Sequence, residues 1–185
     1  MRESGILMHI TSLPAPYGIG TMGKDAYAFV DFLVRAGQRY WQILPLTPTG
    51  YGDSPYQSLG ACAGNHYLID LDRLADEGLL KKEEIQNIPW GSNPARVDFG
   101  AMYAHRMNVL RQAFQRFTPD GAYETFVEQN RNWLEDYALF TALKDTLGGK
   151  PWLDWPEALR LRKADALAEK RRELSDEIRL QYFVQ

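Results

Sequence analysis

The chain has 185 residues, of which 45% are apolar and 24% are charged, and its formal net charge is −3. These values are ordinary for a globular domain with a sizeable core, and the lack of a long basic run argues against nucleic-acid binding. The single cysteine, Cys62, excludes an internal disulfide framework and is typical of a reducing compartment. No segment is apolar enough to span a bilayer and no signal-peptide pattern is present, so we expect a cytoplasmic protein without a membrane partner.

The first forty-odd residues predict a βαβ unit. A short apolar run at residues 6–10 predicts a buried strand, and the Pro- and Gly-rich stretch 11–23 predicts a loop. Apolar residues then recur at helical spacing across 26–33, with Gly37 as a C-terminal cap. A second buried strand is expected at 40–44. The two strands should therefore be parallel.

Parallel strands place the loops that follow them at a common end, which is where α/β folds bind ligands. We therefore expect the loops 11–23 and 45–65 to line the same cleft. The second loop carries Tyr51 and Tyr56 beside Asp53 and Ser54. Aromatic rings cover the apolar face of a sugar, and short polar side chains bond its hydroxyls, so this loop indicates a polyhydroxylated ligand. The alternative is that the tyrosines pack the loop and that Asp53 and Ser54 brace its turns.

The rest of the chain reads mainly as helices. Residues Tyr67–Leu71 predict one more short extended piece, and Asp98 predicts the N-cap of a helix that runs to about Phe117. A turn at 118–121 should lead into one long helix ended by Gly148 and Gly149. The apolar stripe of that helix is expected to comprise Phe126, Trp133, Tyr137, Phe140 and Leu147.

A Trp-rich connector then leads into a last charged helix from about Asp165. Its apolar stripe, formed by Leu174, Ile178, Tyr182 and Phe183, continues to the end of the sequence without a stop signal. This pattern predicts an N-terminal portion of a larger domain. Trp152 and Trp155 in the connector are interpreted as a hydrophobic anchor rather than as a sugar platform.

Other chemically capable residues form no recognisable active centre in the sequence. Glu135 and Asp136 are adjacent on a predicted helix and point in different directions, so they are a poor acid–base pair. His9 is interpreted as a hydrogen-bonded core residue, and Cys62 has no partner pattern for a thiol nucleophile. No His, Cys or carboxylate spacing predicts a metal site, and we expect no cofactor.

Three long segments resemble one enzyme family. They read GQRYWQILPLTPTGYGDSPYQS, AGNHYLIDLDRL and NWLEDYALFTALKDTLGGKPW, and they closely resemble the amylomaltase family of 4-α-glucanotransferases. The resemblance implies an α/β fold that forms the N-terminal part of a (β/α)₈ barrel. In that fold, residues 1–66 would give the first two barrel strands with their substrate-facing loops. Residues 67–185 would give a largely helical inserted subdomain that leads toward a third strand.

The resemblance also implies an activity, namely the transfer of α-1,4-glucan segments between maltooligosaccharides. Such retaining enzymes use two carboxyl groups, one as nucleophile and one as acid and base. The resemblance places these groups on later barrel strands, so we expect no catalytic residue in this chain and no activity of the isolated chain. The alternative is a non-catalytic glucan-binding or structural fragment, whose open strand edges would favour self-association.

Binding roles follow from the resemblance residue by residue. Tyr56 would lie at the donor side of the catalytic cleft, and Asp53 and Ser54 would line that cleft or brace its loop. Tyr51 and Tyr103 would form a secondary glucan-binding groove. The stretch 59–62 departs from the family pattern because aromatic residues common there are replaced by Leu, Gly, Ala and Cys, which predicts a loop that is less well packed.

Overall fold

The computed structural model describes residues 2–50 and 52–185 and divides into two compact units, Met1–Phe117 and Thr118–Gln185. The sequence analysis expected a boundary between residues 66 and 67, where the barrel strands would end and the helical subdomain would begin. Division into compact units does not test which residues belong to a barrel, so this boundary stays a prediction. Each unit is described by itself.

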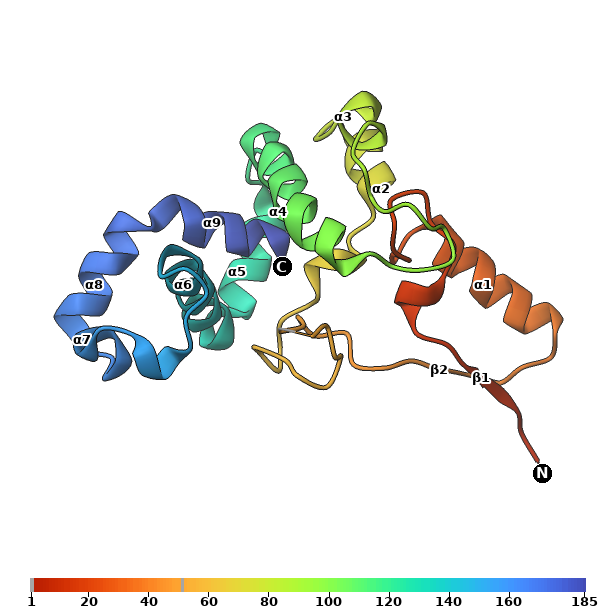
Figure 1. The fold of residues 1–185 in the computed structure, drawn as a ribbon, viewed down its shortest axis with the longest axis horizontal. Coiled ribbons are helices and arrows are strands. Elements are labelled where there is room, and N and C mark those ends of the chain that lie inside the picture. Colours follow the sequence, from red (N-terminus) through yellow and green to blue (C-terminus); the bar gives the residue numbers. More distant parts are fainter. Residues whose placement is uncertain (1, 51) are drawn as a thin grey trace. The chain divides into compact units, whose positions relative to one another are not determined.

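The first unit opens with the expected βαβ arrangement (Figure 1). Strand β1 (Gly5–Leu7) pairs in parallel with β2 (Tyr40–Gln42), and α1 (Lys24–Arg35) connects them. The parallel pairing is confirmed. Both strands are shorter than expected, and β1 ends where a 3-10 helix, η1 (Ile10–Ser12), follows.

The prediction that both strands are buried was wrong. The strand residues are exposed or half-buried, and the Leu7 side chain is 60% exposed. A two-stranded sheet leaves each strand with one neighbour, and α1 covers only part of it. That cover consists mainly of Phe29, whose ring lies edge-on to Trp41 at 4.9 Å between centroids. The Trp41 indole N–H also donates to the carbonyl of Met8 at 2.7 Å, which fastens the two strands near their ends.

The end of α1 follows the predicted pattern. Gly37 adopts a φ of +69°, a left-handed conformation that favours glycine, and so ends the helix as predicted. Leu33 is buried, whereas Val30 on the same predicted stripe is exposed. The helix therefore packs through a narrower stripe than its apolar spacing suggests.

The loop 11–23 is packed into the core of the first unit. Tyr17 and Ile19 are buried. The Tyr17 hydroxyl donates to Asp72 at 2.6 Å, and the Thr21 hydroxyl donates to Asp70 at 3.2 Å. These bonds tie the loop to the helix that begins at residue 71, so the loop is a braced element rather than an open one.

After the long loop, the first unit contains a short turn and three helices. Residues 67–71 are not extended as expected, because the Asn65 side chain accepts from the amide of Tyr67 and starts a 3-10 turn, and Asp70 then caps the next helix. Asp98 caps the long helix as predicted, accepting from the Ala101 amide. The elements are η2 (His66–Leu68), α2 (Leu71–Asp76), α3 (Lys82–Gln86) and α4 (Phe99–Arg116). The apolar spacing of α4 predicts an inner face of Met102, Leu110, Ala113 and Phe117. The first three are buried, whereas Phe117 at the end of the helix is half-buried.

The second unit is helical, and each long helix predicted there is divided in two. Asn130 separates the first pair: its amide donates to the Phe126 carbonyl at 2.8 Å and its side-chain oxygen accepts from the Trp133 indole at 3.0 Å. Leu174 separates the last pair. The elements are α5 (Gly121–Gln129), α6 (Arg131–Thr146), η3 (Trp152–Asp154), α7 (Glu157–Arg160), α8 (Ala164–Glu173) and α9 (Ser175–Val184).

Helices α7, α8 and α9 curve around α6 (Figure 1), and the core of the second unit lies between them. Trp155 is buried and stacks on Phe140 at 5.3 Å, which confirms its role as an anchor, whereas Trp152 is about half exposed. The fully buried face of α6 differs from the predicted stripe, whose members are only half-buried. That buried face comprises Leu134, Ala138, Leu139, Ala142 and Leu143.

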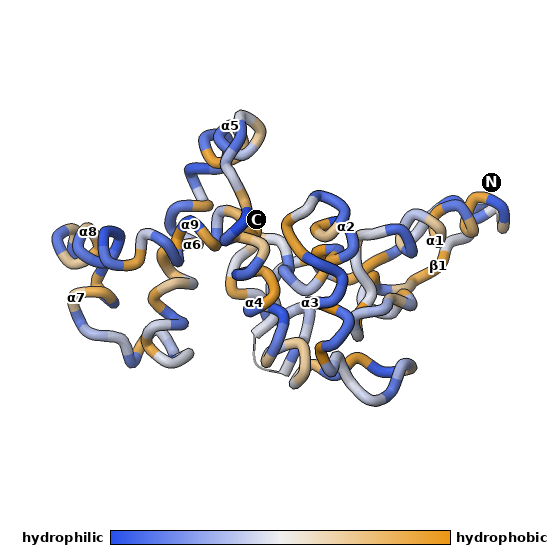
Figure 2. The backbone as a smooth tube through the Cα atoms, turned by 90° about the horizontal axis from the view of Figure 1, so that it is seen from above, coloured by the Kyte–Doolittle hydropathy of each residue, from blue (hydrophilic) through white to orange (hydrophobic). Residues whose placement is uncertain are grey.

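Hydrophobic and hydrophilic residues are interspersed along the helices (Figure 2). Within residues 2–50 and 52–185, no helix combines the length and the apolar character required to cross a membrane.

We predict that Gly20→Ala destabilises the first unit by about 3 kcal/mol, because an added Cβ would lie 1.9 Å from the Ile10 carbonyl oxygen. Urea unfolding followed by circular dichroism measures the change. Gly50→Ala is the control, since its Cβ would meet only the Gln57 carbonyl at 3.5 Å. Equal midpoints for the two variants would contradict the prediction.

Candidate functional site

The loop 45–65 is closed at its base and folded back on itself in the middle. The Asn65 amide donates to the Leu46 carbonyl at 2.8 Å, which brings the two ends of the loop together. Farther out, Thr49 and Ser58 form an antiparallel bridge, and the Gly50 amide donates to the Gln57 carbonyl at 3.0 Å. These contacts make a small hairpin whose tip carries the predicted ligand residues.

At the tip, Asp53 and Ser54 organise the turn. Asp53 has a φ of +56° and donates its amide to the Gly50 carbonyl at 3.1 Å. A left-handed conformation is uncommon for a residue with a side chain, although Asp tolerates it. The Ser54 hydroxyl accepts from the Tyr56 amide at 3.4 Å, and the Ser54 carbonyl accepts from the Gln57 amide at 3.0 Å. Both residues therefore have bracing roles, and their contact with a glucan stays a prediction.

The two described tyrosines of the predicted site are strongly exposed. The Tyr56 side chain on the hairpin is 73% exposed, and the Tyr103 side chain on α4 is 84% exposed. Tyr51, the third, lies outside the described residues. Leu59 and Cys62 in the same loop are also exposed, as expected from the departure of this stretch from the family pattern. The exposed rings are available to a ligand rather than used for packing.

A buried tyrosine links the hairpin to α4. Burial raises the pKa of Tyr67 to about 12, and the Asp53 carboxylate and the Tyr103 phenol both add to this rise. Both groups therefore act electrostatically on this phenol, although they are fifty residues apart in sequence. The sequence analysis did not single out Tyr67, which is buried.

Arg106 on α4 is a further residue that the sequence analysis missed. Its side chain is fully buried. It donates to the carbonyls of His66 at 3.4 Å and Tyr67 at 2.9 Å, and also to the carbonyl of Ile69. Its guanidinium lies 5.9 Å from the Trp90 ring centre, a cation–π distance. Among the described residues its Nη1 atom has no hydrogen-bond partner. An Arg in the middle of a helix gives no sequence signal that separates a buried side chain from a solvated one.

The surroundings of two histidines, His9 and His66, favour the neutral form of the imidazole ring. His66 stacks on Tyr67 at 4.3 Å, and burial together with the nearby Arg106 charge lowers its pKa to about 4. His9 accepts from the Leu44 amide at 3.3 Å, and burial lowers its pKa as well. The hydrogen bond expected of His9 is confirmed, but its side chain is half-buried rather than part of the core.

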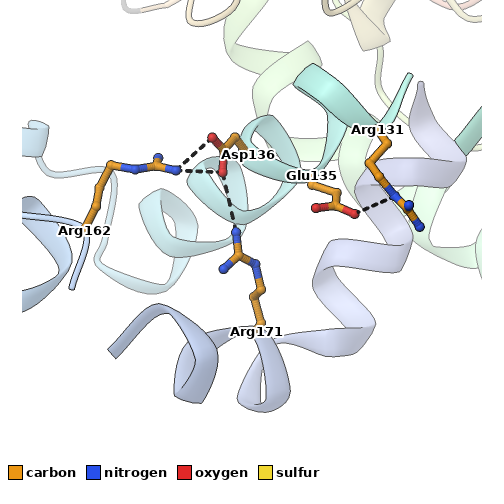
Figure 3. A network of polar contacts seen from close by, with 5 residues as sticks. All are labelled: Arg131, Glu135, Asp136, Arg162 and Arg171. Atoms are coloured by element: carbon orange, nitrogen blue, oxygen red, sulfur yellow. Dashed lines mark hydrogen bonds and ion pairs between the residues drawn. The ribbon is translucent and has the colours of Figure 1, made fainter. Parts of the chain in front are cut away.

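Polar residues of the second unit form a surface network (Figure 3). One nitrogen of Arg162 lies 2.8 Å from both Asp136 oxygens, and Arg171 approaches the same carboxylate at 3.5 Å. Glu135 points elsewhere and pairs with Arg131 at 3.2 Å. The two adjacent carboxylates are therefore separately paired and do not face each other.

A cavity of about 250 Å³ lies next to Asp136, between α6 and the Trp-rich connector. Leucines and the rings of Phe140, Trp152 and Trp155 form most of its lining. Its polar groups, Asp136 and Arg162, are already bonded to each other. Within residues 2–50 and 52–185, the chain has no group of three or more His, Cys, Asp or Glu side chains that could hold a metal ion.

Comparison with known proteins relates the whole chain to one family. Residues 8–185 match a family model described as 4-alpha-glucanotransferase. The chain is 49% identical to the 4-alpha-glucanotransferase of Thermus thermophilus, covering all of this chain and 37% of that protein. It is 48% identical to the enzyme of Streptococcus pneumoniae serotype 4, covering 96% of this chain and 36% of that protein.

A solved structure gives the same relation. The amylomaltase from Streptococcus agalactiae in complex with acarbose superimposes with a TM-score of 0.95 at 45% identity. The match covers 100% of this chain and 38% of that structure. The chain thus spans little more than a third of the length of these relatives.

We predict that His66 makes stability fall in mild acid. Its folded pKa of about 4 lies below the ordinary value of about 6.5, so the unfolded chain binds the proton first as the pH drops. The stabilisation that comes from keeping His66 neutral in the folded state is complete above pH 6.5 and declines toward pH 4. Between pH 7 and pH 5 the free energy of unfolding should fall by about 2 kcal/mol more in the parent chain than in His66→Gln. Urea unfolding at both pH values measures this difference. Parallel losses in both proteins would contradict this assignment.

Proposed function

This chain belongs to the 4-alpha-glucanotransferase family, and on that basis we propose that it supplies glucan-binding loops to an enzyme that transfers α-1,4-glucan segments between maltooligosaccharides. The observation that best supports this proposal is the pair of strongly exposed rings, Tyr56 on the hairpin and Tyr103 on α4. Exposed tyrosines on braced backbone make stacking platforms that lose little entropy on binding.

Each candidate residue has a proposed role. Tyr56 contacts the donor side of the catalytic cleft, and Asp53 and Ser54 shape the hairpin and offer oxygen atoms to sugar hydroxyls. Tyr103 and Tyr51 form a secondary groove for a glucan chain. The exposure of Tyr56 and Tyr103 supports these roles, and the bonds of Asp53 and Ser54 within the turn support a hairpin that holds its shape.

The proposed reaction is a retaining double displacement. One carboxylate forms a covalent glycosyl intermediate and a second carboxyl group acts as acid and then as base. We propose that both groups come from protein outside these 185 residues. In support, the one adjacent pair of carboxylates that the sequence raised, Glu135 and Asp136, is engaged by arginines.

We further propose that β1 and β2 are the first two strands of a (β/α)₈ barrel and that residues 67–185 are the helical insertion. The exposed apolar residues Ile6 and Leu7 support this placement, because a closed barrel would cover both faces of these strands. The same exposure favours the second candidate, a non-catalytic fragment that self-associates through its strand edges. The single, unpaired Cys62 supports a cytoplasmic location.

We predict that the isolated chain does not disproportionate maltotriose, because the carboxyl groups of the reaction are not in it. Incubation with maltotriose followed by chromatography should show neither glucose nor longer oligosaccharides, while a full-length family member under the same conditions produces both. Turnover by the purified chain, with contaminating enzyme excluded, would overturn the proposed division of the active site.

We predict that Tyr103→Ala weakens maltoheptaose binding three- to tenfold, since one stacking contact contributes about 0.5–1.5 kcal/mol. Isothermal titration calorimetry measures the affinity. Tyr27→Ala is the matched control, because Tyr27 is also a helical tyrosine, is 66% exposed and lies outside the proposed groove. A similar loss in both variants would show that Tyr103 has no specific role.

A further inference from the structure

Packing alone does not explain why the Arg106 guanidinium is buried. Burying a charged group costs free energy unless its hydrogen bonds are well made, and an apolar side chain fills such a site at lower cost. The hydrogen bonds of this guanidinium go to backbone carbonyls of three residues within a four-residue stretch, His66, Tyr67 and Ile69. A side chain that bonds several carbonyls of one short segment fixes the position of that backbone rather than that of another side chain.

The segment bonded by Arg106, residues 66–69, directly follows the loop 45–65, and we call it the stem of that loop. Asn65, which immediately precedes it, closes the loop through its amide bond to Leu46 and receives the Tyr67 amide on its side chain. Arg106 itself lies one turn after Tyr103 on α4, so the two residues move together. The bonds of one side chain therefore connect the element that carries Tyr103 to the element that carries Asp53 and Tyr56.

We propose that Arg106 is a positioning residue that holds the base of the loop 45–65 and Tyr103 at a fixed separation, so that the exposed rings of Tyr56 and Tyr103 keep their places at the glucan site. This inference rests on the proposed function for the identity of the ligand, but its geometric part does not. Arg106 makes no contact with the glucan. It acts by keeping the two elements in place before the ligand arrives, which reduces the ordering cost of binding.

Lysine cannot replace this arginine. Its ammonium is a single point donor, whereas the guanidinium spreads its donors over a rigid fork that reaches several carbonyls at once. Arg106→Lys retains the positive charge and most of the aliphatic part of the side chain, but it cannot bond all three carbonyls. Arg116 offers a matched control on the same helix, because it also bonds a backbone carbonyl, that of Leu79, and pairs with Glu84 at 2.6 Å, but it does not touch the loop stem.

The geometric part is tested by a distance measurement that needs no ligand. Cys62 is the chain's one cysteine and is exposed in the loop, and Gln112→Cys adds an exposed partner on α4. Spin labels at these two positions should give a narrow distance distribution in the Arg106 parent and in Arg116→Lys. In Arg106→Lys the distribution should broaden at least twofold. Equal widths in all three folded proteins would overturn the proposal.

The functional part is tested by titration with maltoheptaose. We expect affinity to fall about tenfold in Arg106→Lys and to stay within twofold in Arg116→Lys. If the parent chain binds no maltoheptaose while the distance distribution still broadens in Arg106→Lys, the proposed function fails and the positioning role stands. If the parent binds and Arg106→Lys binds equally well, the positioning role fails and the proposed function stands.

If Arg106→Lys does not fold, amide hydrogen exchange of the unaltered chain tests whether the stem is held against α4. The amides of Asn65 and Tyr67 are bonded within the stem, so a stem held by Arg106 should release them only together with the buried amides of α4. We expect their protection to come within tenfold of that of Leu110. Exchange more than a hundredfold faster than Leu110 would mean that the stem opens by itself, and the proposal would be wrong.

Discussion

The buried guanidinium of Arg106 is the constraint on which the first unit depends. It binds three carbonyl groups of the segment 66–69 from a helix some forty residues later in the chain. The long-range contact joins α4, the longest described helix of this unit, to the segment that follows its exposed loop. Because a buried cation without its partners is costly, any movement of the stem away from α4 is opposed by more than lost packing.

The two loops that leave the parallel strands are held in different ways. The loop 11–23 lies in the core, where Tyr17 and Thr21 bond the carboxylates of Asp72 and Asp70 and glycines permit close backbone approach. The loop 45–65 is closed at its base and folds back on itself in a hairpin. The first loop therefore serves as part of the scaffold, and the second presents side chains to solvent.

Much of this organisation could be predicted from the sequence, since local signals determine it. Gly37 and Asp98 mark helix ends through backbone conformation and side-chain capping, which depend on a few neighbouring residues. The break at Asn130 was missed because an Asn inside an apolar repeat competes with the helix only through its specific bonds to Phe126 and Trp133. The exposure of the strands and the grip of Arg106 depend on contacts distant in sequence, which periodicity cannot reveal. Tyr56 was indicated by the composition of its loop and Tyr103 only by the family resemblance, and the exposure of both rings agrees with these expectations.

The exposed thiol of Cys62 makes the hairpin region unusually accessible to chemistry. Because the chain has no other cysteine, a maleimide dye attached there would sit at one known place, within the same loop as Asp53 and Tyr56. The emission of such a dye reports on local polarity and motion, so the native protein already carries an attachment point for a probe of the proposed glucan site.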